Sequence, residues 1–236
     1  MYFVGCSGWF YWHWRGKFYP ENLQQSKWFQ HYVKYFNTVE LNSPFYHWPK
    51  QSTAKSWYRQ APENFVYTLK VNDTITHMKK FKGTARLVKE FYKLADELKE
   101  KMGCFLFQLP PSLKFSENKL KEILNQLEPE KKNVVEFRHV SWFKKEVYDE
   151  FKSNGIIFCI VSYPHLPEDL VKTADDIYIR LHGKKSRYAS NYSKEELEQW
   201  SQKIQKSKAK NVWAYFNNDF NAHAVNNSLY LKKLLS

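Results

Sequence analysis

Eight short apolar segments alternate with longer segments, most of helical periodicity, along this chain of 236 residues. Each apolar segment has the length and composition of a buried β-strand. A strand followed by a helix, repeated many times, predicts parallel strands joined by right-handed crossovers. The predicted strands cover residues 2–5, 38–41, 65–71, 104–109, 134–137, 156–161, 177–181 and 212–216.

Helical periodicity is clearest in three of the intervening segments. Apolar residues recur at helical spacing within residues 87–98, 120–127 and 197–204, and residues 221–235 can supply a closing helix. Ser193 and Glu196 have the spacing of a capping box, which predicts a helix start at that point.

Eight such units predict an α/β protein, a TIM-type (β/α)8 barrel formed as a single domain by residues 1–236. The chain is short for this fold, so we expect a reduced sixth helix, and residues 164–173 are the weakest helical segment. An open doubly wound sheet is the alternative, but no Gly-rich phosphate loop follows the first strand.

The balance of charges is strongly basic, with 37 Lys and Arg against 24 Asp and Glu and a net charge of +13. This excess favours anionic partners by long-range attraction and leaves a nucleic-acid partner open. Much of it comes from Lys on amphipathic helices, where solvated helix faces explain it better.

Cysteine usage and hydropathy indicate the compartment. Three widely spaced Cys in apolar runs predict reduced core thiols rather than a disulfide framework or a zinc site. The apolar stretch at the start of the sequence is too short for the hydrophobic region of a signal sequence, and no apolar run has membrane-spanning length. We therefore expect a cytoplasmic protein without a membrane partner.

Charged or amide side chains end six of the eight predicted strands. Because active sites of TIM-type barrels lie at the C-terminal ends of the strands, these residues should gather on one rim. The group consists of Glu40, Asn42, Lys70, Gln108, Glu136, Arg138, Arg180, His182, Asn217 and Asn218, with His77 and His223 close behind two strand ends.

Acid–base chemistry is the first function that these residues suggest. Glu40, Glu136 and His182 are the candidate catalytic residues. Arg138 lies two positions from Glu136 and should lower the pKa of that carboxyl, which suits binding better than proton donation. A hydrogen-bonded structural role is equally open for His182, and structural ion pairs remain an alternative for the carboxylates.

Recognition of an anion is the second function that these residues suggest. Arg138, Arg180 and Lys70 together suit a phosphate or carboxylate, and Lys70 could instead form a Schiff base. The remaining rim residues are candidates to bind and orient a substrate: Asn42, His77, Gln108, Asn217, Asn218 and His223.

A divalent metal is a third, open possibility. The rim carries five residues of metal-ligand type, but no tight motif such as His-Glu-x-x-His is present. The sequence requires no cofactor. The five candidates are Glu40, Glu136, His182, Asp219 and His223.

Aromatic residues crowd the loops that follow the strands. Seven lie within residues 9–19, Tyr46 follows the second strand, and Trp142 follows the fifth. Their rings can stack on a sugar or a base, or the first loop can fold over the barrel mouth and pack on itself.

Short motifs spread over the whole chain carry a family resemblance. They are GCSGW at residues 5–9, TVELNSPFY at 38–46, QLPP at 108–111, VEFRH at 135–139, RLHG at 180–183 and YFNND at 215–219. In this combination and order, the chain resembles the YecE-like family, a domain of unknown function. The resemblance implies a TIM-type barrel but no established activity, and Pro44 stands where the family usually has Thr.

The leading hypothesis is a barrel enzyme of hydrolase, lyase or isomerase type that acts on a small anionic or sugar-like substrate at the rim. The alternatives are a metal-dependent phosphoesterase or nuclease and a non-catalytic binder of a ligand or nucleic acid.

Overall fold

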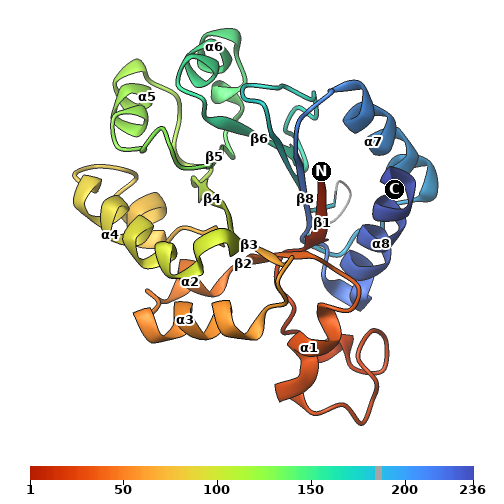
Figure 1. The fold of residues 1–236 in the computed structure, drawn as a ribbon. Helices are drawn as coiled ribbons and strands as arrows, with labels where there is room; N and C mark the ends of the chain where they lie inside the picture. Colours follow the sequence, from red (N-terminus) through yellow and green to blue (C-terminus); the bar gives the residue numbers. More distant parts are fainter. Residues whose placement is uncertain (184–187) are drawn as a thin grey trace.

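Eight parallel strands form a nearly closed barrel that helices surround (Figure 1). The structure is a computed structural model, and it describes residues 1–183 and 188–236. All eight predicted strands are confirmed. They are β1 (Tyr2–Cys6), β2 (Thr38–Leu41), β3 (Val66–Lys70), β4 (Met102–Gln108), β5 (Asn133–Glu136), β6 (Ile157–Ser162), β7 (Ile177–Leu181) and β8 (Val212–Phe216).

Helices follow most of the strands and cover the outside of the barrel. The predicted capping box starts α7: the Ser193 hydroxyl accepts the Glu196 N–H at 3.2 Å, and the Glu196 carboxylate accepts the Ser193 N–H at 2.8 Å. The helices are α1 (Trp28–Tyr32), α2 (Ser43–Tyr46), α3 (Gln51–Gln60), α4 (Ala85–Ala95), α5 (Glu117–Leu124), α6 (Lys145–Ser153), α7 (Lys194–Lys206) and α8 (His223–Leu235).

The crossover from β6 to β7 contains no helix anywhere in residues 163–176, all of which the structure describes. The sixth β/α unit of the barrel therefore has no helix, which confirms the predicted reduction of the sixth helix; the helix labelled α6 belongs to the fifth unit. Pro164 and Pro167 oppose a continuous helix here because proline lacks the N–H that helical hydrogen bonds need. The Thr173 hydroxyl holds the end of this loop, accepting the Phe158 N–H at 2.8 Å and donating to the Ile156 carbonyl at 2.6 Å.

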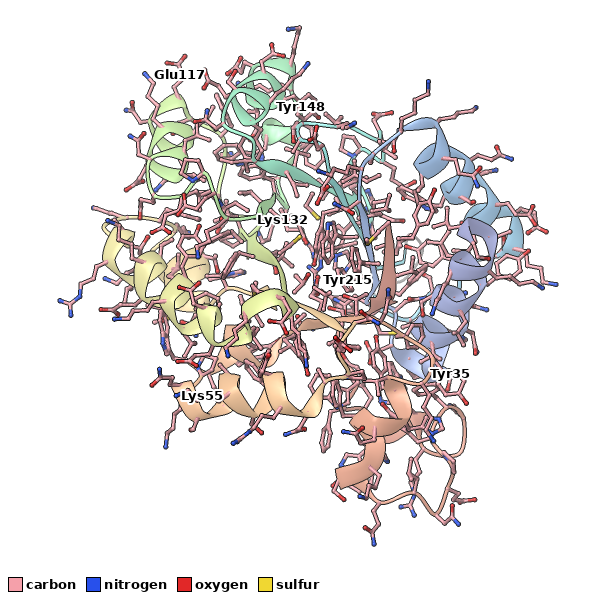
Figure 2. All side chains as sticks on the ribbon, in the orientation of Figure 1. Tyr35, Lys55, Glu117, Lys132, Tyr148 and Tyr215 are labelled. Atoms are coloured by element: carbon pink, nitrogen blue, oxygen red, sulfur yellow. The ribbon has the colours of Figure 1, made fainter. Side chains whose placement is uncertain are left out.

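Side chains alternate between the inside and the outside of the barrel along each strand. In β7, Ile177, Ile179 and Leu181 belong to the core between strands and helices, and Tyr178 belongs to the interior cluster. Figure 2 shows another member, Tyr215, in the middle of the barrel. The interior cluster consists of Cys104, Leu106, Val134, Ile157, Cys159, Val161, Tyr178, Trp213 and Tyr215.

The same alternation places the charged residues inside. Each one stands between two residues of the outer core: Glu40 between Val39 and Leu41, Lys70 between Leu69 and Val71, Glu136 between Val135 and Phe137, and Arg180 between Ile179 and Leu181. The barrel interior is therefore apolar near the N-terminal ends of the strands and charged near their C-terminal ends.

Strands β1 and β2 are joined by a side chain rather than by backbone hydrogen bonds between the strands. The hydrogen-bonded strand order runs from β1 through β8 to β2, so these two strands are the edges. The Tyr32 hydroxyl bridges them, accepting the Cys6 N–H at 2.9 Å and donating to the Thr38 carbonyl at 3.0 Å. Gly5 permits this approach, since a Cβ there would lie 2.6 Å from the Thr38 oxygen.

Among the helices of the described residues, none combines the length and the apolar character that a membrane crossing requires.

Candidate functional site

An ionic layer of four side chains, Glu40, Glu136, Arg138 and Arg180, crosses the barrel near the C-terminal ends of the strands. Arg180 on β7 binds Glu40 on β2 through two contacts, Nη2–Oε1 at 2.6 Å and Nε–Oε2 at 2.9 Å. Its Nη1 also binds Glu136 Oε2 on β5 at 2.6 Å. These three side chains are at most 1% exposed. Paired geometry of this kind is what makes buried charge tolerable.

Further donors complete the layer. The Tyr178 hydroxyl donates to Glu40 Oε2 at 2.6 Å, and the Ser7 hydroxyl donates to Glu40 Oε1. Arg138 Nε donates to Glu136 Oε1. Every carboxylate oxygen of the layer therefore has a donor.

The electrostatics fix Glu136 as a carboxylate. Burial alone would raise its pKa, but Arg138 and Arg180 outweigh burial and lower the pKa to about 2. The predicted effect of Arg138 on Glu136 is thus confirmed in direction. Glu136 is an anchor for two guanidinium groups, and it has no proton to donate at neutral pH.

His182 is fully buried and bonded at both ring nitrogens. Arg138 Nη2 donates to its Nε2 at 2.9 Å, so the neutral ring carries its proton on Nδ1. Nδ1 lies 3.2 Å from the Asn217 side-chain amide and donates to it when the amide oxygen faces the ring. Burial and the nearby Arg138, Arg180 and Lys70 hold the pKa of His182 well below its usual value. The neutral ring positions Arg138, and neither nitrogen is free to act as a base in this arrangement.

A cleft of about 680 Å³ lies at the C-terminal ends of β1, β2, β3 and β8. We call it the Lys70 cleft. Four of the predicted binding residues line it: Asn42, Tyr46, Lys70 and Asn217. The other lining residues are Gly8, Trp9, Phe10, Tyr11, Leu41, Ser43, Trp57, Tyr188 and Asp219.

Lys70 has the least usual environment in the cleft. Its Nζ lies 3.6 Å from the centre of the Phe45 ring, and the residue is 8% exposed. No residue of the described chain accepts a hydrogen bond from this amine or forms an ion pair with it. Burial, with a contribution from Arg180, lowers the pKa of Lys70 to about 7.

Two further predicted residues lie near Lys70: His77 contacts Phe45, and Gln108 contacts His77. The His77 ring packs edge-on against Phe45, with 4.9 Å between ring centres. His77 Nε2 lies 3.4 Å from the Gln108 amide nitrogen, and Nδ1 lies 3.0 Å from the Thr76 hydroxyl. Burial and Lys70 lower the pKa of His77. Neither His77 nor Gln108 lines the cleft, so their part in binding stays a prediction.

Two predicted binding residues point away from the cleft. Trp142 is fully buried, stacks on Phe137 at 4.0 Å between ring centres and donates to the Leu113 carbonyl at 2.8 Å. The prediction of an accessible stacking ring is wrong for this residue, because the turn at residues 140–142 folds it into the core.

Asn218 is the second predicted binding residue that points away from the cleft. It is fully buried, and its amide donates to the Ser190 carbonyl and to Asn227 Oδ1, each at 2.8 Å. It stands one position after Asn217, so its side chain turns to the other side of the chain. His223, the first residue of α8, is also not among the residues that line the cleft.

The five candidate metal ligands are not assembled into one group. Glu40 and Glu136 bind arginines, His182 accepts from Arg138, and Asp219 Oδ2 lies 3.1 Å from His13 Nε2. Within residues 1–183 and 188–236, no group of three or more His, Cys, Asp or Glu is placed to hold a metal ion.

The aromatic residues of the first loop divide between the two predicted roles. Trp9, Phe10 and Tyr11 line the cleft, whereas Trp14 and Tyr19 are buried in the core. Tyr19 stacks on Trp28 with 4.7 Å between ring centres.

Sequence reasoning missed two supports of the ionic layer, Ser7 and Tyr178. The signal for Tyr178 was present, because it stands two positions before Arg180 and so shares its face of β7. Ser7 directly follows β1, at the same height as the other strand ends. Neutral hydroxyls at strand ends carry a weaker signal than charges do.

Comparisons with known proteins agree with this architecture. The chain has a TM-score of 0.90 and 29% identity to the crystal structure of a DUF72 family protein from Thermotoga maritima, covering 100% of this chain and 99% of that one. A DUF72 family protein from Enterococcus faecalis shares the fold at a TM-score of 0.86 and 20% identity, covering 100% and 95%.

Sequence relatives give the same result. The chain is 26% identical to the UPF0759 protein YunF of Bacillus subtilis, over 100% of this chain and 95% of that protein. It is 29% identical to the UPF0759 protein YecE of Escherichia coli over 54% of this chain and 47% of that protein. Residues 3–236 match the family described as "Protein of unknown function DUF72". The resemblance to the YecE-like family is thus confirmed, and the chain belongs to the DUF72 family.

Proposed function

We propose that this protein is an enzyme that binds a small anionic or sugar-like substrate in the Lys70 cleft. The observation that carries the proposal is the composition of the cleft, where an amine without an acceptor in residues 1–183 and 188–236 stands among amides and aromatic rings. The ionic layer lies against it and is internally neutral, with two carboxylates and two guanidinium groups. None of its four side chains lines the cleft; the layer adjoins the cleft through Ser7, whose hydroxyl binds Glu40 and accepts from the Asn42 amide at 3.0 Å.

The cleft offers contacts for both substrate classes. The amide of Asn217 can exchange hydrogen bonds with hydroxyl groups. The Asn42 amide donates to the Ser7 carbonyl and hydroxyl, and its buried Oδ1 has no partner among the described residues. The rings of Trp9, Phe10 and Tyr46 suit the apolar face of a sugar. Protonated Lys70 would attract a carboxylate or phosphate.

A catalytic role is favoured over simple binding by the titratable groups of the cleft. Lys70, with a pKa of about 7, can gain and lose a proton near neutral pH. Asp219 lines the same cleft, and burial raises its pKa. Such perturbed groups cluster at active sites.

The compartment, a nucleic-acid partner and metal dependence are further proposals. The cytoplasm suits the three buried free thiols, Cys6, Cys104 and Cys159. A nucleic-acid partner rests on the net charge of +13 alone. The metal-dependent alternative gains no support from the ligand-type side chains of the described chain.

Calorimetry at neutral pH with sugars, sugar acids, short carboxylates and phosphate tests the proposal. We expect at least one class to bind, and Asn217→Ala to weaken that binding. Asn154→Ala is the matched control, because Asn154 is exposed at the end of α6. Absence of binding by every class at millimolar concentration would overturn the proposal.

A further inference from the structure

We propose that the Lys70 amine forms an imine with the carbonyl group of a small polyhydroxy aldehyde or ketone in the cleft. This inference rests on the proposed function and names the chemistry of its substrate.

The position of Lys70 is the first argument. It is the last residue of β3, and the neighbours on either side, Leu69 and Val71, pack in the outer core. Its side chain is therefore directed into the barrel, and it lines the cleft. The strand fixes the backbone at this point, so the amine is held at the cleft by a rigid element.

The absence of a partner is the second argument. A buried lysine normally has acceptors, as Lys101 shows: it is 7% exposed and donates to the carbonyls of Tyr58 at 2.9 Å and Ala61 at 2.8 Å. Lys70 is 8% exposed and, within the described chain, has only the face of Phe45. A ring face does not consume the lone pair of a neutral amine, so nitrogen stays available for attack.

The protonation state is the third argument. Only the neutral amine is a nucleophile. With a pKa of about 7, about half of Lys70 is neutral at pH 7. An ordinary lysine with a pKa near 10.4 has about 10³-fold less neutral amine at that pH. Lys70 should therefore react far ahead of the surface lysines.

The reaction balances without any oxidant or reductant. The Lys70 nitrogen forms a bond to the carbonyl carbon, the carbonyl π electrons move to oxygen, and that oxygen gains a proton as nitrogen loses one. The resulting carbinolamine loses its hydroxyl group with a further proton as water, which leaves a C=N bond. Asp219 is the carboxyl group that lines the same cleft, and the proposal assigns it the proton transfers of both steps.

The surroundings select the substrate class. When Lys70 acts as a neutral amine, it supplies no positive charge, and Arg138 and Arg180 are already bound to carboxylates. Among the described residues, the other polar groups of the cleft are uncharged apart from Asp219; they include the Asn217 amide and the hydroxyl groups of Ser43 and Tyr46, beside the aromatic rings. Hydroxyl groups match these contacts better than a phosphate or a second carboxylate does.

Borohydride trapping tests the inference. Protein at pH 7 is mixed with glyceraldehyde or dihydroxyacetone, reduced with borohydride, and mapped by peptide mass spectrometry. We expect reduced adduct at Lys70 to form at least about 10²-fold faster than at surface lysines such as Lys55, which allows for restricted access to the cleft. Lys101 is the buried internal control and should stay unmodified.

Three comparisons make the test specific. Glycerol, which lacks a carbonyl, should give no adduct; Lys70→Met should abolish the fast adduct; and Lys70→Arg should do the same while keeping a positive charge. Reversible binding of the same compounds is measured separately by calorimetry without borohydride. Circular dichroism establishes that both variants are folded.

The outcomes separate the two proposals. Binding of a hydroxy-carbonyl compound without preferential adduct at Lys70 would overturn the imine and leave the proposed function standing. Adduct at Lys70 with pyruvate but with neither hydroxy-carbonyl compound would overturn the substrate class. Equal modification of Lys70 and the surface lysines, together with no binding by any compound in calorimetry, would overturn both proposals.

Discussion

Two hollows at opposite ends of the barrel differ in the hydrogen bonds of the buried polar groups beside them. At the N-terminal end, Asp176 is 7% exposed and receives Lys132 Nζ at 3.1 Å, the Asn211 amide at 2.8 Å and the Trp213 indole N–H at 3.2 Å. The position of this lysine, Lys132, is labelled in Figure 2. At the C-terminal end, Lys70 has no acceptor and Asn42 Oδ1 has no donor within the described chain.

Size does not distinguish the two ends. A hollow of about 780 Å³ lies among the loops at the N-terminal end, and the Lys70 cleft measures about 680 Å³. The difference lies in satisfied hydrogen bonds. Paired groups stabilise a fold, whereas buried groups without partners cost free energy, so we assign structure to the first hollow and chemistry to the Lys70 cleft.

The largest effect on stability is expected for the ionic layer that adjoins the cleft. Arg180→Met should destabilise the protein by about 4 kcal/mol or more, because it leaves Glu40 and Glu136 buried with too few donors. Chemical denaturation measures the change. Arg86→Met, whose side chain is 90% exposed, is the control and should change stability by less than about 0.5 kcal/mol. Equal stability of the two variants would show that the layer is not a scaffold.

The second test applies one substitution to two equally buried lysines. Lys70→Met should stabilise the protein by about 2–4 kcal/mol at pH 7, because it removes a buried cation without an acceptor. Lys101→Met should destabilise it by about 1–3 kcal/mol, because two carbonyls lose their donor. Denaturant melts of the two variants give both values. Two changes of the same sign would abolish the contrast between the ends.

The third test is the pH dependence of stability. Because the pKa of Lys70 is lowered from 10.5 to about 7, the unfolded chain binds more protons between these values. Stability should therefore rise with pH through this window, and the cost of Lys70 should be full below pH 7. The advantage of Lys70→Met over wild type should shrink by about 2 kcal/mol between pH 7 and pH 9. A constant difference over that range would contradict the lowered pKa.

The smallest effect is expected at the rim of the cleft. Tyr46 is 65% exposed and lines the cleft, so Tyr46→Ala should weaken substrate binding by about 1 kcal/mol through lost ring contact. Tyr35→Ala is the matched control, since Tyr35 is 41% exposed and packs on Phe18 near α1 (Figure 2). Calorimetry measures both. Equal loss in the two variants would remove the rim from the binding site.

Local sequence patterns were sufficient for the fold. Apolar runs located all eight strands, the Ser193–Glu196 capping box located the start of α7, and the weak segment after β6 proved to have no helix. Strand alternation also predicted that Glu136 and Arg138 would interact, because both partners come from one short segment. Their pairing needs no knowledge of the barrel geometry.

Contacts across the barrel were beyond these patterns. The pairing of Arg180 with Glu40 joins residues 140 positions apart and depends on how the strands are staggered around the barrel. Trp142 and Asn218 follow strand ends just as the cleft residues do, but a short turn and a one-residue offset direct them elsewhere. The missing acceptor of Lys70 is visible only once every neighbour is placed.

Titration of the Lys70 side chain by NMR, with isotope-labelled lysine and Lys70→Arg to assign the signal, tests the central claim most directly. We predict a midpoint near pH 7 for Lys70. A midpoint near the ordinary lysine value of about 10.4 would show that the amine is stabilised as a cation, and it would contradict the account of the cleft.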